Sequence, residues 1–163
     1  MVRPLRASDR EEVKRILEAA DLFTPAEIAC ALEQVDIFLH QPQQPDYRLV
    51  VVENGQGEIA GFMSYGPTPL TEGTFDLYWI VVSPWEQRKG YGQLLVKWLE
   101  EKVQKEKGRL ILIETSSQPK YLGTRLFYEK MGYREVARVR DFYRPGDDRV
   151  IYAKKLNEER ERK

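Results

Sequence analysis

The sequence has few of the residues that build several common kinds of functional site. It contains one cysteine, Cys30, and one histidine, His40, so no intramolecular disulfide can form and neither a multi-histidine metal site nor a histidine-based triad is expected. Its 26 lysine and arginine residues are balanced by 26 aspartate and glutamate residues. This balance argues against a general nucleic-acid-binding protein, which carries a basic excess. We therefore expect a protein that binds neither a metal nor nucleic acid.

Long apolar stretches are also absent. No run approaches the length that spans a membrane, and the first residues lack the apolar segment of a signal peptide. Together with the single cysteine, these features predict a cytoplasmic protein with no membrane partner. Cys30 falls in a helical pattern and is expected to be a small packed thiol rather than a nucleophile.

What is present suits one folded domain. The chain has 163 residues, of which 42% are apolar, and this is enough to bury a sizeable core. We expect a single domain over residues 1–156 and a charged C-terminal tail over residues 157–163. Periodicity and turn signals predict strands at Val2–Arg6, Tyr47–Glu53, Glu58–Tyr65, Thr74–Val82, Leu110–Thr115, Tyr133–Phe142 and Arg149–Lys155, and helices at Arg10–Ala20, Pro25–Leu39, Gly90–Lys107 and Tyr121–Met131. This order predicts an α/β (α+β) fold with a mixed sheet and helices on both faces.

The segment from Ile80 to Gln93 is the most informative part of the sequence. A strand ends, a short loop containing Gly90 and Gly92 follows, and an amphipathic helix begins. A helix start offers unpaired N–H groups and the positive end of the helix dipole, and glycine lets an anion approach the backbone. The neighbouring Arg88 and Lys89 add positive charge. The pattern predicts a pyrophosphate site, whereas the alternative is a tight turn with solvated basic side chains.

Two widespread phosphate motifs do not fit this segment. A P-loop requires Gly-Lys-Ser/Thr, which is absent, and a Rossmann fingerprint requires a third glycine-like residue where Leu95 stands. The segment instead resembles the Gln/Arg-x-x-Gly-x-Gly/Ala signature of the GNAT N-acetyltransferase superfamily, through Gln87, Gly90 and Gly92.

The resemblance extends over about Arg3–Leu156. The strands Leu77–Val82 and Leu110–Thr115, and the Phe-Tyr-Glu-Lys-x-Gly-Tyr segment within Arg125–Tyr133, fall where this family has its counterparts. It implies a GNAT fold with a central mixed, mostly antiparallel sheet of about seven strands, and acetyl-CoA as cosubstrate. It also implies that a strand holds the pantetheine arm, that the helix start holds the pyrophosphate, and that thioester and amine meet in a V-shaped slot. The implicated residues are Ile80, Val81 and Val82 for the arm, and Gln87, Arg88, Lys89, Gly90, Tyr91, Gly92 and Gln93 for the pyrophosphate.

The resemblance also suggests how a proton could reach the departing thiolate. Tyr128 stands where similar enzymes place a tyrosine hydroxyl near the CoA sulfur, which makes it the candidate acid. The alternative is that Tyr128 is a core aromatic with its hydroxyl at the surface. Tyr121 and Tyr133 are weaker competitors for the role.

The candidate general base is Glu114, at the end of an otherwise apolar strand. Partial burial there would raise its pKa toward a useful value, and some family members carry a base at the matching place. Asp76 on the preceding strand and a water molecule are the alternatives. Asp141 and Tyr143, on the last hairpin, could bind the acceptor amine or simply form a polar turn. The helical segment Phe23–Phe38 matches the part of the family fold that walls the acceptor site.

These features predict an acetyl-CoA-dependent N-acetyltransferase of the EC 2.3.1 class. It would transfer an acetyl group directly to a primary amine of a small molecule or protein, as a monomer or homodimer. Two alternatives keep the fold: a non-catalytic CoA-binding sensor or interaction module, and an acyltransferase that uses a longer acyl-CoA.

Overall fold

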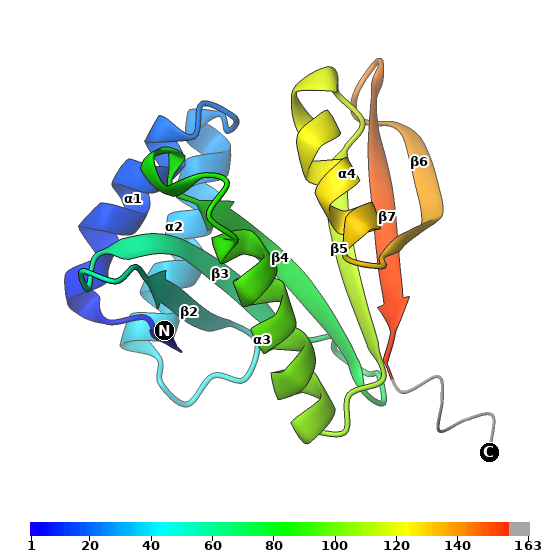
Figure 1. Cartoon of the computed structure of the whole chain (residues 1–163). Helices are drawn as coiled ribbons and strands as arrows, with labels where there is room; N and C mark the ends of the chain where they lie inside the picture. The colour runs from blue at the N-terminus through cyan, green and yellow to red at the C-terminus, as the bar shows by residue number, and fades with distance from the viewer. Residues whose placement is uncertain (157–163) are drawn as a thin grey trace. The chain divides into compact units, whose positions relative to one another are not determined.

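The structure, a computed structural model, describes residues 1–156, so the predicted tail at 157–163 lies outside the described residues. It contains the strands and helices that periodicity predicts, with small shifts at their ends (Figure 1). They are β1 (Val2–Pro4), α1 (Arg10–Ala19), α2 (Pro25–His40), β2 (Arg48–Glu53), β3 (Ile59–Pro67), β4 (Thr74–Val82), α3 (Tyr91–Lys105), β5 (Leu110–Ser116), α4 (Leu122–Lys130), β6 (Arg134–Arg144) and β7 (Asp147–Lys155). Short 3₁₀ turns occupy Ala7–Asp9, Pro84–Glu86 and Pro119–Tyr121.

The seven strands form one sheet in the order β1-β2-β3-β4-β5-β7-β6. β4 and β5 run parallel, with a register from Thr74↔Leu110 to Leu77↔Ile113. The pairs β1–β2, β2–β3, β5–β7 and β6–β7 are antiparallel. The predicted mixed, mostly antiparallel sheet of about seven strands is therefore confirmed.

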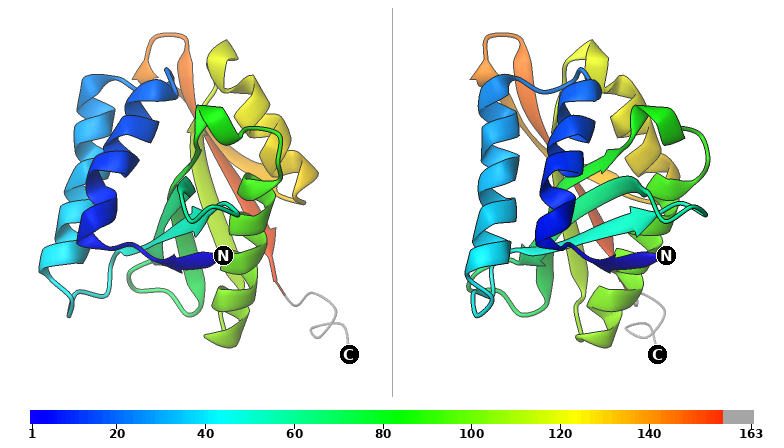
Figure 2. Two further views of the ribbon diagram at one scale, coloured as in Figure 1. Left: turned by 60° about the vertical axis from the view of Figure 1, so that its left-hand side comes forward. Right: turned by 90° about the vertical axis from the view of Figure 1, so that its left-hand side faces the viewer.

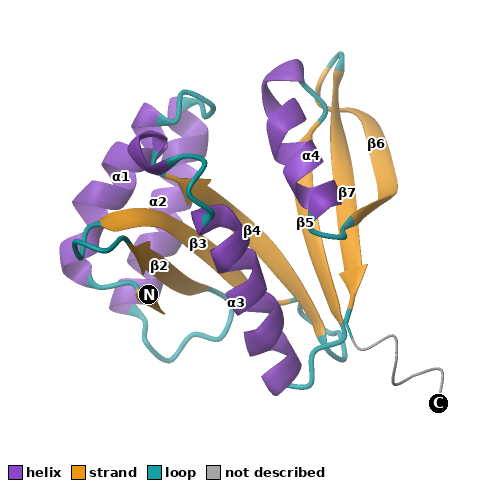
Figure 3. Ribbon diagram, in the orientation of Figure 1, coloured by secondary structure: helices purple, strands orange, loops and turns teal. Residues whose placement is uncertain are grey.

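The chain divides into two compact units. The N-terminal unit comprises Met1–Pro67 and Tyr78–Leu99, and the C-terminal unit comprises Thr68–Leu77 and the chain from Glu100 onward. In the N-terminal unit, α1 and α2 lie side by side on one face of the strands and the first part of α3 lies on the other face (Figure 2). In the C-terminal unit, α4 lies along β5 and β7 (Figure 3). The main core cluster belongs to the N-terminal unit and consists of Leu5, Val13, Ile16, Leu17, Ala31, Leu32, Val35, Leu49, Val51, Phe62 and Val81.

Helix α2 begins as its sequence predicts but differs on one face. Thr24 Oγ1 accepts a hydrogen bond from Glu27 N (3.2 Å) and Glu27 Oε1 accepts one from Thr24 N (3.1 Å), which is the reciprocal capping box. Cys30, in contrast, is exposed. The prediction of a packed thiol is wrong because Ala31 and Val35, on a neighbouring stripe, form the buried face.

The end of α3 shows why a glycine follows it. The helix ends at Lys105, and Lys107 rather than Gly108 takes the left-handed conformation, with φ of 63°. Gly108 N donates to Val103 O at 2.8 Å. A Cβ on Gly108 would lie 2.2 Å from Val103 Cγ1 and 3.0 Å from Phe75 Cε2. Glycine is therefore required here for close packing and not for a positive φ.

Strand β6 is the last strand of the sheet, and all of its residues are exposed. Three apolar side chains on it are open to solvent: Val136 (59%), Val139 (44%) and Phe142 (50%). Its register with β7 is interrupted between Val139 and Arg144, which produces a bulge. None of the helices within residues 1–156 is both long and apolar enough to cross a membrane.

Candidate functional site

The turn between β4 and α3 is fastened to the neighbouring strand and to the end of β4. Ser83 N donates to Ala60 O of β3 (2.7 Å), and Ser83 Oγ accepts from Trp85 N (3.3 Å). Gln87 Nε2 donates to Val82 O at 2.9 Å. The glutamine of the sequence signature therefore holds the turn in place through its side chain.

Two residues of this turn have left-handed backbone conformations. Arg88 has φ of 63° and Gly90 has φ of 86°. The left-handed region costs a non-glycine residue about 1–2 kcal/mol, so the surrounding turn must hold Arg88 there. A Cβ on Gly90 would meet no atom within 4 Å. The backbone conformation, and not a lack of space, therefore requires glycine at this position, and turns of this kind direct N–H groups toward an anion.

The start of α3 supplies further donors. The first intrahelical hydrogen bond of this end runs from Leu94 N to Gly90 O (3.0 Å). The N–H groups of Tyr91, Gly92 and Gln93 therefore have no intrahelical acceptor. They point along the positive end of the helix dipole, which favours a negatively charged ligand.

The two basic side chains of the turn differ in how they are paired. Lys89 Nζ lies 2.8 Å from Glu86 Oε2, and this hydrogen bond raises the pKa of Lys89. Glu86 also accepts a hydrogen bond from Asn54 Nδ2 (3.0 Å). Arg88 is exposed and has no ion-pair partner within residues 1–156. Of the two predicted cations, Arg88 is the one whose charge is not already neutralised.

The end of β4 contains the three residues assigned to the pantetheine arm. Val81 is buried, whereas Ile80 and Val82 are half-buried. All three follow Leu77, which is the last residue of β4 that pairs with β5. Val82 O is partly used by Gln87, although a carbonyl oxygen can accept a second hydrogen bond.

Tyr128 of α4 is buried among other aromatic rings. It is 5% exposed, and its ring centroid lies 6.0 Å from that of Tyr152 and 6.5 Å from that of Tyr133. Burial raises the pKa of its hydroxyl, and the nearby Tyr121 raises it further. A tyrosine hydroxyl is protonated at neutral pH even at its ordinary pKa, so this environment agrees with a proton donor and with a core aromatic alike.

Tyr133 has a similar environment. It is 1% exposed, and burial and the adjacent Glu100 raise the pKa of its hydroxyl. Tyr121, the other competitor, lies in the 3₁₀ turn before α4 and is half-buried.

Glu114 differs from the sequence-based expectation. Its side chain is 42% exposed, and its Oε1 accepts a hydrogen bond from Arg149 Nη2. The partial burial on which the prediction of a raised pKa depended is therefore absent. The register explains the contact, because Ser116 pairs with Arg149 and Glu114 lies two residues away on the same face of the sheet. Sequence reasoning missed Arg149, because alternation does not reveal which β7 residue lies beside Glu114.

Asp76, the alternative base, lies in the paired part of β4. It is half-buried, and its Oδ2 accepts a hydrogen bond from Thr68 Oγ1 at 2.7 Å. It pairs with Leu112 of β5.

Asp141 and Tyr143 lie in the bulged part of β6, and both are exposed. Asp141 Oδ1 accepts from Gly146 N (2.8 Å), and Asp141 N donates to Asp148 Oδ1 (3.0 Å). These contacts are those of a polar turn. Tyr143 stands edge-on to Phe142, with ring centroids 5.0 Å apart.

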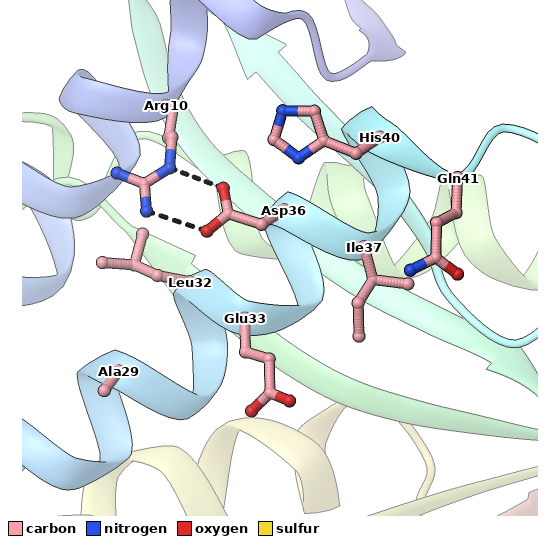
Figure 4. Close-up of a pocket in the computed structure, with 8 residues that line it drawn as sticks. All are labelled: Arg10, Ala29, Leu32, Glu33, Asp36, Ile37, His40 and Gln41. Atoms are coloured by element: carbon pink, nitrogen blue, oxygen red, sulfur yellow. Dashed lines mark hydrogen bonds and ion pairs between the residues drawn. The ribbon is translucent and has the colours of Figure 1, made fainter.

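A pocket opens on the helical pair of the N-terminal unit. It is lined by Arg10, Ala29, Leu32, Glu33, Asp36, Ile37, His40 and Gln41 (Figure 4). Arg10 binds Asp36 through both carboxylate oxygens, at 2.7 and 3.0 Å. Part of its lining falls in the segment Phe23–Phe38, and no member of the predicted catalytic or coenzyme set contributes to it. Within residues 1–156 no group of three potential ligands could hold a metal ion.

Known proteins resemble this chain over nearly its whole length. Residues 45–135 match the family model described as an acetyltransferase (GNAT) domain. A Desulfovibrio desulfuricans protein assigned to the GNAT acetyltransferases is 40% identical with a TM-score of 0.89, covering 95% of this chain and 98% of that one. No curated protein matches the sequence.

Two more distant structures share the fold. The ribosomal-protein-S18-alanine N-acetyltransferase of Escherichia coli is 21% identical with a TM-score of 0.73, covering 96% of this chain and 93% of that one. An aminoglycoside 6'-N-acetyltransferase complexed with coenzyme A is 18% identical with a TM-score of 0.72, covering 95% and 96%.

Proposed function

The chain belongs to the GNAT family of acetyltransferases, and on this basis we propose that it transfers the acetyl group of acetyl-CoA directly to a primary amine. The observation that carries the proposal is the turn into α3. Three features of this turn suit a diphosphate: the left-handed Gly90, the amides of Tyr91, Gly92 and Gln93, and the charge of Arg88, which has no ion-pair partner among the described residues.

The same turn would hold the coenzyme through several groups. Amides from Arg88 to Gln93 would bind the pyrophosphate, and backbone groups of Ile80 and Val82 would bind the pantetheine arm. Gln87 supports this arrangement indirectly, because its side chain fixes the turn against Val82 O. When bound, acetyl-CoA supplies an acyl group that is already activated as a thioester.

Two proton movements must accompany the transfer. The acceptor nitrogen loses a proton and the departing thiolate gains one, so the protein needs a base and an acid. We assign the acid to Tyr128, because it stands where similar enzymes place a tyrosine hydroxyl near the CoA sulfur and a tyrosine hydroxyl is protonated at neutral pH. A lysine-like amine with a pKa near 10.4 costs about 4–5 kcal/mol to deprotonate at pH 7, which is the barrier that the base helps to lower.

The base remains a choice between Glu114, Asp76 and a water molecule. Glu114 is exposed and has one carboxylate oxygen without a protein donor within the described residues. Asp76 is half-buried but already accepts from Thr68. We favour Glu114, because its second oxygen is available to an ammonium group.

The structural neighbours act on different amines. By name, one acetylates a ribosomal protein alanine and another acetylates aminoglycosides. We propose a small amine for this chain. A CoA-binding sensor and an enzyme for longer acyl groups are the competing functions.

Release of free thiol from acetyl-CoA tests the proposal. The purified full chain is incubated with acetyl-, propionyl- or succinyl-CoA and a panel of amines, and binding of CoA is measured in parallel by calorimetry. We expect CoA binding and amine-dependent thiol release that is fastest with acetyl-CoA. Binding without turnover for any amine would favour the sensor, and an absence of CoA binding would refute the proposal.

A further inference from the structure

Three residues from three strands of the C-terminal unit form a cluster in which two side chains are exposed and the third is half-buried. Glu114 comes from β5, Phe142 from β6 and Arg149 from β7. Arg149 Nη2 donates to Glu114 Oε1, and the guanidinium carbon of Arg149 lies 4.9 Å from the centroid of the Phe142 ring. The aromatic ring and the carboxylate together fix the orientation of the guanidinium group.

The hydrogen-bonding capacity of this ion pair is largely unused. Of the five N–H groups of Arg149, only one on Nη2 has an acceptor within the described residues. Its Nε is shielded from solvent and has no acceptor in the part of the chain that the structure describes. Folded proteins rarely leave such a donor unsatisfied. Glu114 Oε2 likewise has no donor within residues 1–156.

Two other arginines of the chain, Arg138 and Arg3, are each shared between two carboxylates. Arg138 pairs with Glu135 (2.8 Å) and with Asp148 (3.2 Å). Arg3 is likewise shared between two carboxylates, those of Asp9 and Glu53. Arg149 binds one carboxylate, and its remaining N–H groups are available to donate to a second.

From this we propose that the acceptor is an α-amino acid in its zwitterionic form, which rests on the proposed acetyltransferase function. The ammonium group would donate to Glu114 and the carboxylate would accept from Arg149. In a zwitterion the two charges are adjacent, so it can lie antiparallel to the Glu114–Arg149 pair with both of its charges matched.

The residues around the ion pair indicate which kind of side chain the acceptor amino acid carries. Phe142 is 50% exposed and presents an apolar surface beside the guanidinium group. The amino acid would therefore have an apolar side chain. The positive charge of Arg149 disfavours a polyamine, because a second ammonium group would be repelled.

Matched pairs of acceptors test the inference. Leucine, methionine and phenylalanine are each compared with the amine that lacks the carboxylate: isopentylamine, 3-(methylthio)propylamine and phenethylamine. We expect kcat/KM for thiol release to be about ten- to a hundredfold higher for the amino acid, which is the effect of one hydrogen bond to a charged group. L-Phenylalanine methyl ester should behave like the amine.

Variants locate the effect at Arg149. R149M should lower kcat/KM about ten- to a hundredfold more for the amino acids than for the matched amines. R149K, which keeps the charge but loses the planar fork, should give an intermediate loss. R138M, which removes another ion-paired arginine of the same hairpin, should leave both substrates unchanged. Saturation-transfer NMR with CoA present compares the binding of phenylalanine to these variants and to the unmodified chain without turnover.

The outcomes separate this inference from the proposed function. Equal rates for amino acid and amine, or an equal loss of both in R149M, would overturn the amino acid assignment while leaving the acetyltransferase intact. An absence of thiol release with every amine would instead remove the function on which the inference rests.

Discussion

Tyr128 and Glu114 show how far single residues could be predicted from the sequence. The sequence places Tyr128 in an aromatic helix segment, and the structure finds it buried with a raised pKa. The environment of Glu114 was predicted incorrectly, because an otherwise apolar strand does not guarantee that a polar residue near its end is buried. The contact that Arg149 makes with Glu114 comes from the register of β5 with β7, which periodicity cannot supply.

Tyr128→Phe should separate the two roles of this tyrosine. The ring packing survives, so the melting temperature and CoA affinity should change little. Loss of the proton donor should lower kcat by about a hundredfold. Tyr152→Phe is the matched control, since its ring lies next to that of Tyr128 and its hydroxyl donates to Glu129 at 3.4 Å. If both variants turn over normally, Tyr128 is only a core residue.

Asp9 should make stability depend on pH in the acid range. Arg3 donates to both of its oxygens (2.7 and 3.0 Å), and Arg6 N donates to Oδ2 (2.8 Å). Burial alone would raise the pKa of Asp9, but these hydrogen bonds outweigh it and the pKa is lowered. Stability from this group is therefore complete above its unfolded pKa of about 3.9 and is lost as the pH falls through the lower folded value.

Urea unfolding at several pH values measures this contribution. Asp9→Asn should cost roughly 1–3 kcal/mol at pH 7, and the difference from the unmodified chain should shrink below about pH 4. A difference that stays constant down to pH 2 would contradict the assignment.

At the scale of elements, both ends of α3 depend on a glycine, for different reasons. At the start, Gly90 provides a left-handed φ of 86°, whereas at the end Gly108 avoids a clash with Val103. The helix itself and the turn before it were predictable from periodicity and composition. That Lys107 would take the left-handed conformation was not, because the choice depends on how closely Gly108 approaches Val103.

Gly90→Val should weaken CoA binding by about tenfold or more, because a β-branched residue disfavours a positive φ and would distort the turn that is proposed to bind the pyrophosphate. Gly146→Val is the matched control. Gly146 also has a positive φ (83°) and open space around a Cβ, but it lies in the β6–β7 turn. Both variants should lose similar stability, and calorimetry should find weaker CoA binding only for Gly90→Val. An unchanged affinity for CoA in that variant would refute the proposal that this turn binds the pyrophosphate.

Gly108→Ala should destabilise the protein by about 1–3 kcal/mol through overpacking against Val103. Gly123→Ala, in α4, is the control, because a Cβ there meets no atom within 4 Å. It should be neutral or stabilising by up to about 1 kcal/mol. Thermal or urea unfolding distinguishes the two, and equal effects would contradict the packing argument.

At the scale of the whole molecule, the order of elements along the chain was predictable and their order in space was less so. Alternating apolar residues predict where the strands lie in the sequence, and the family resemblance predicts a mixed, mostly antiparallel sheet. Periodicity alone reveals neither that β7 lies between β5 and β6 nor that β4 and β5 stay paired only as far as Leu77 and Ile113. Such long-range pairing depends on contacts between segments far apart in the sequence.

The exposed last strand has a consequence for how the protein behaves at high concentration. An edge strand with exposed Val136, Val139 and Phe142 can pair with a strand of another chain and so begin aggregation. β6 counters this risk with four arginines and two acidic residues, and with a bulge that interrupts its straight course. Solubility of this enzyme thus depends on the charges and irregularity of an eleven-residue strand, and replacing its arginines with apolar residues would make the molecule prone to self-association.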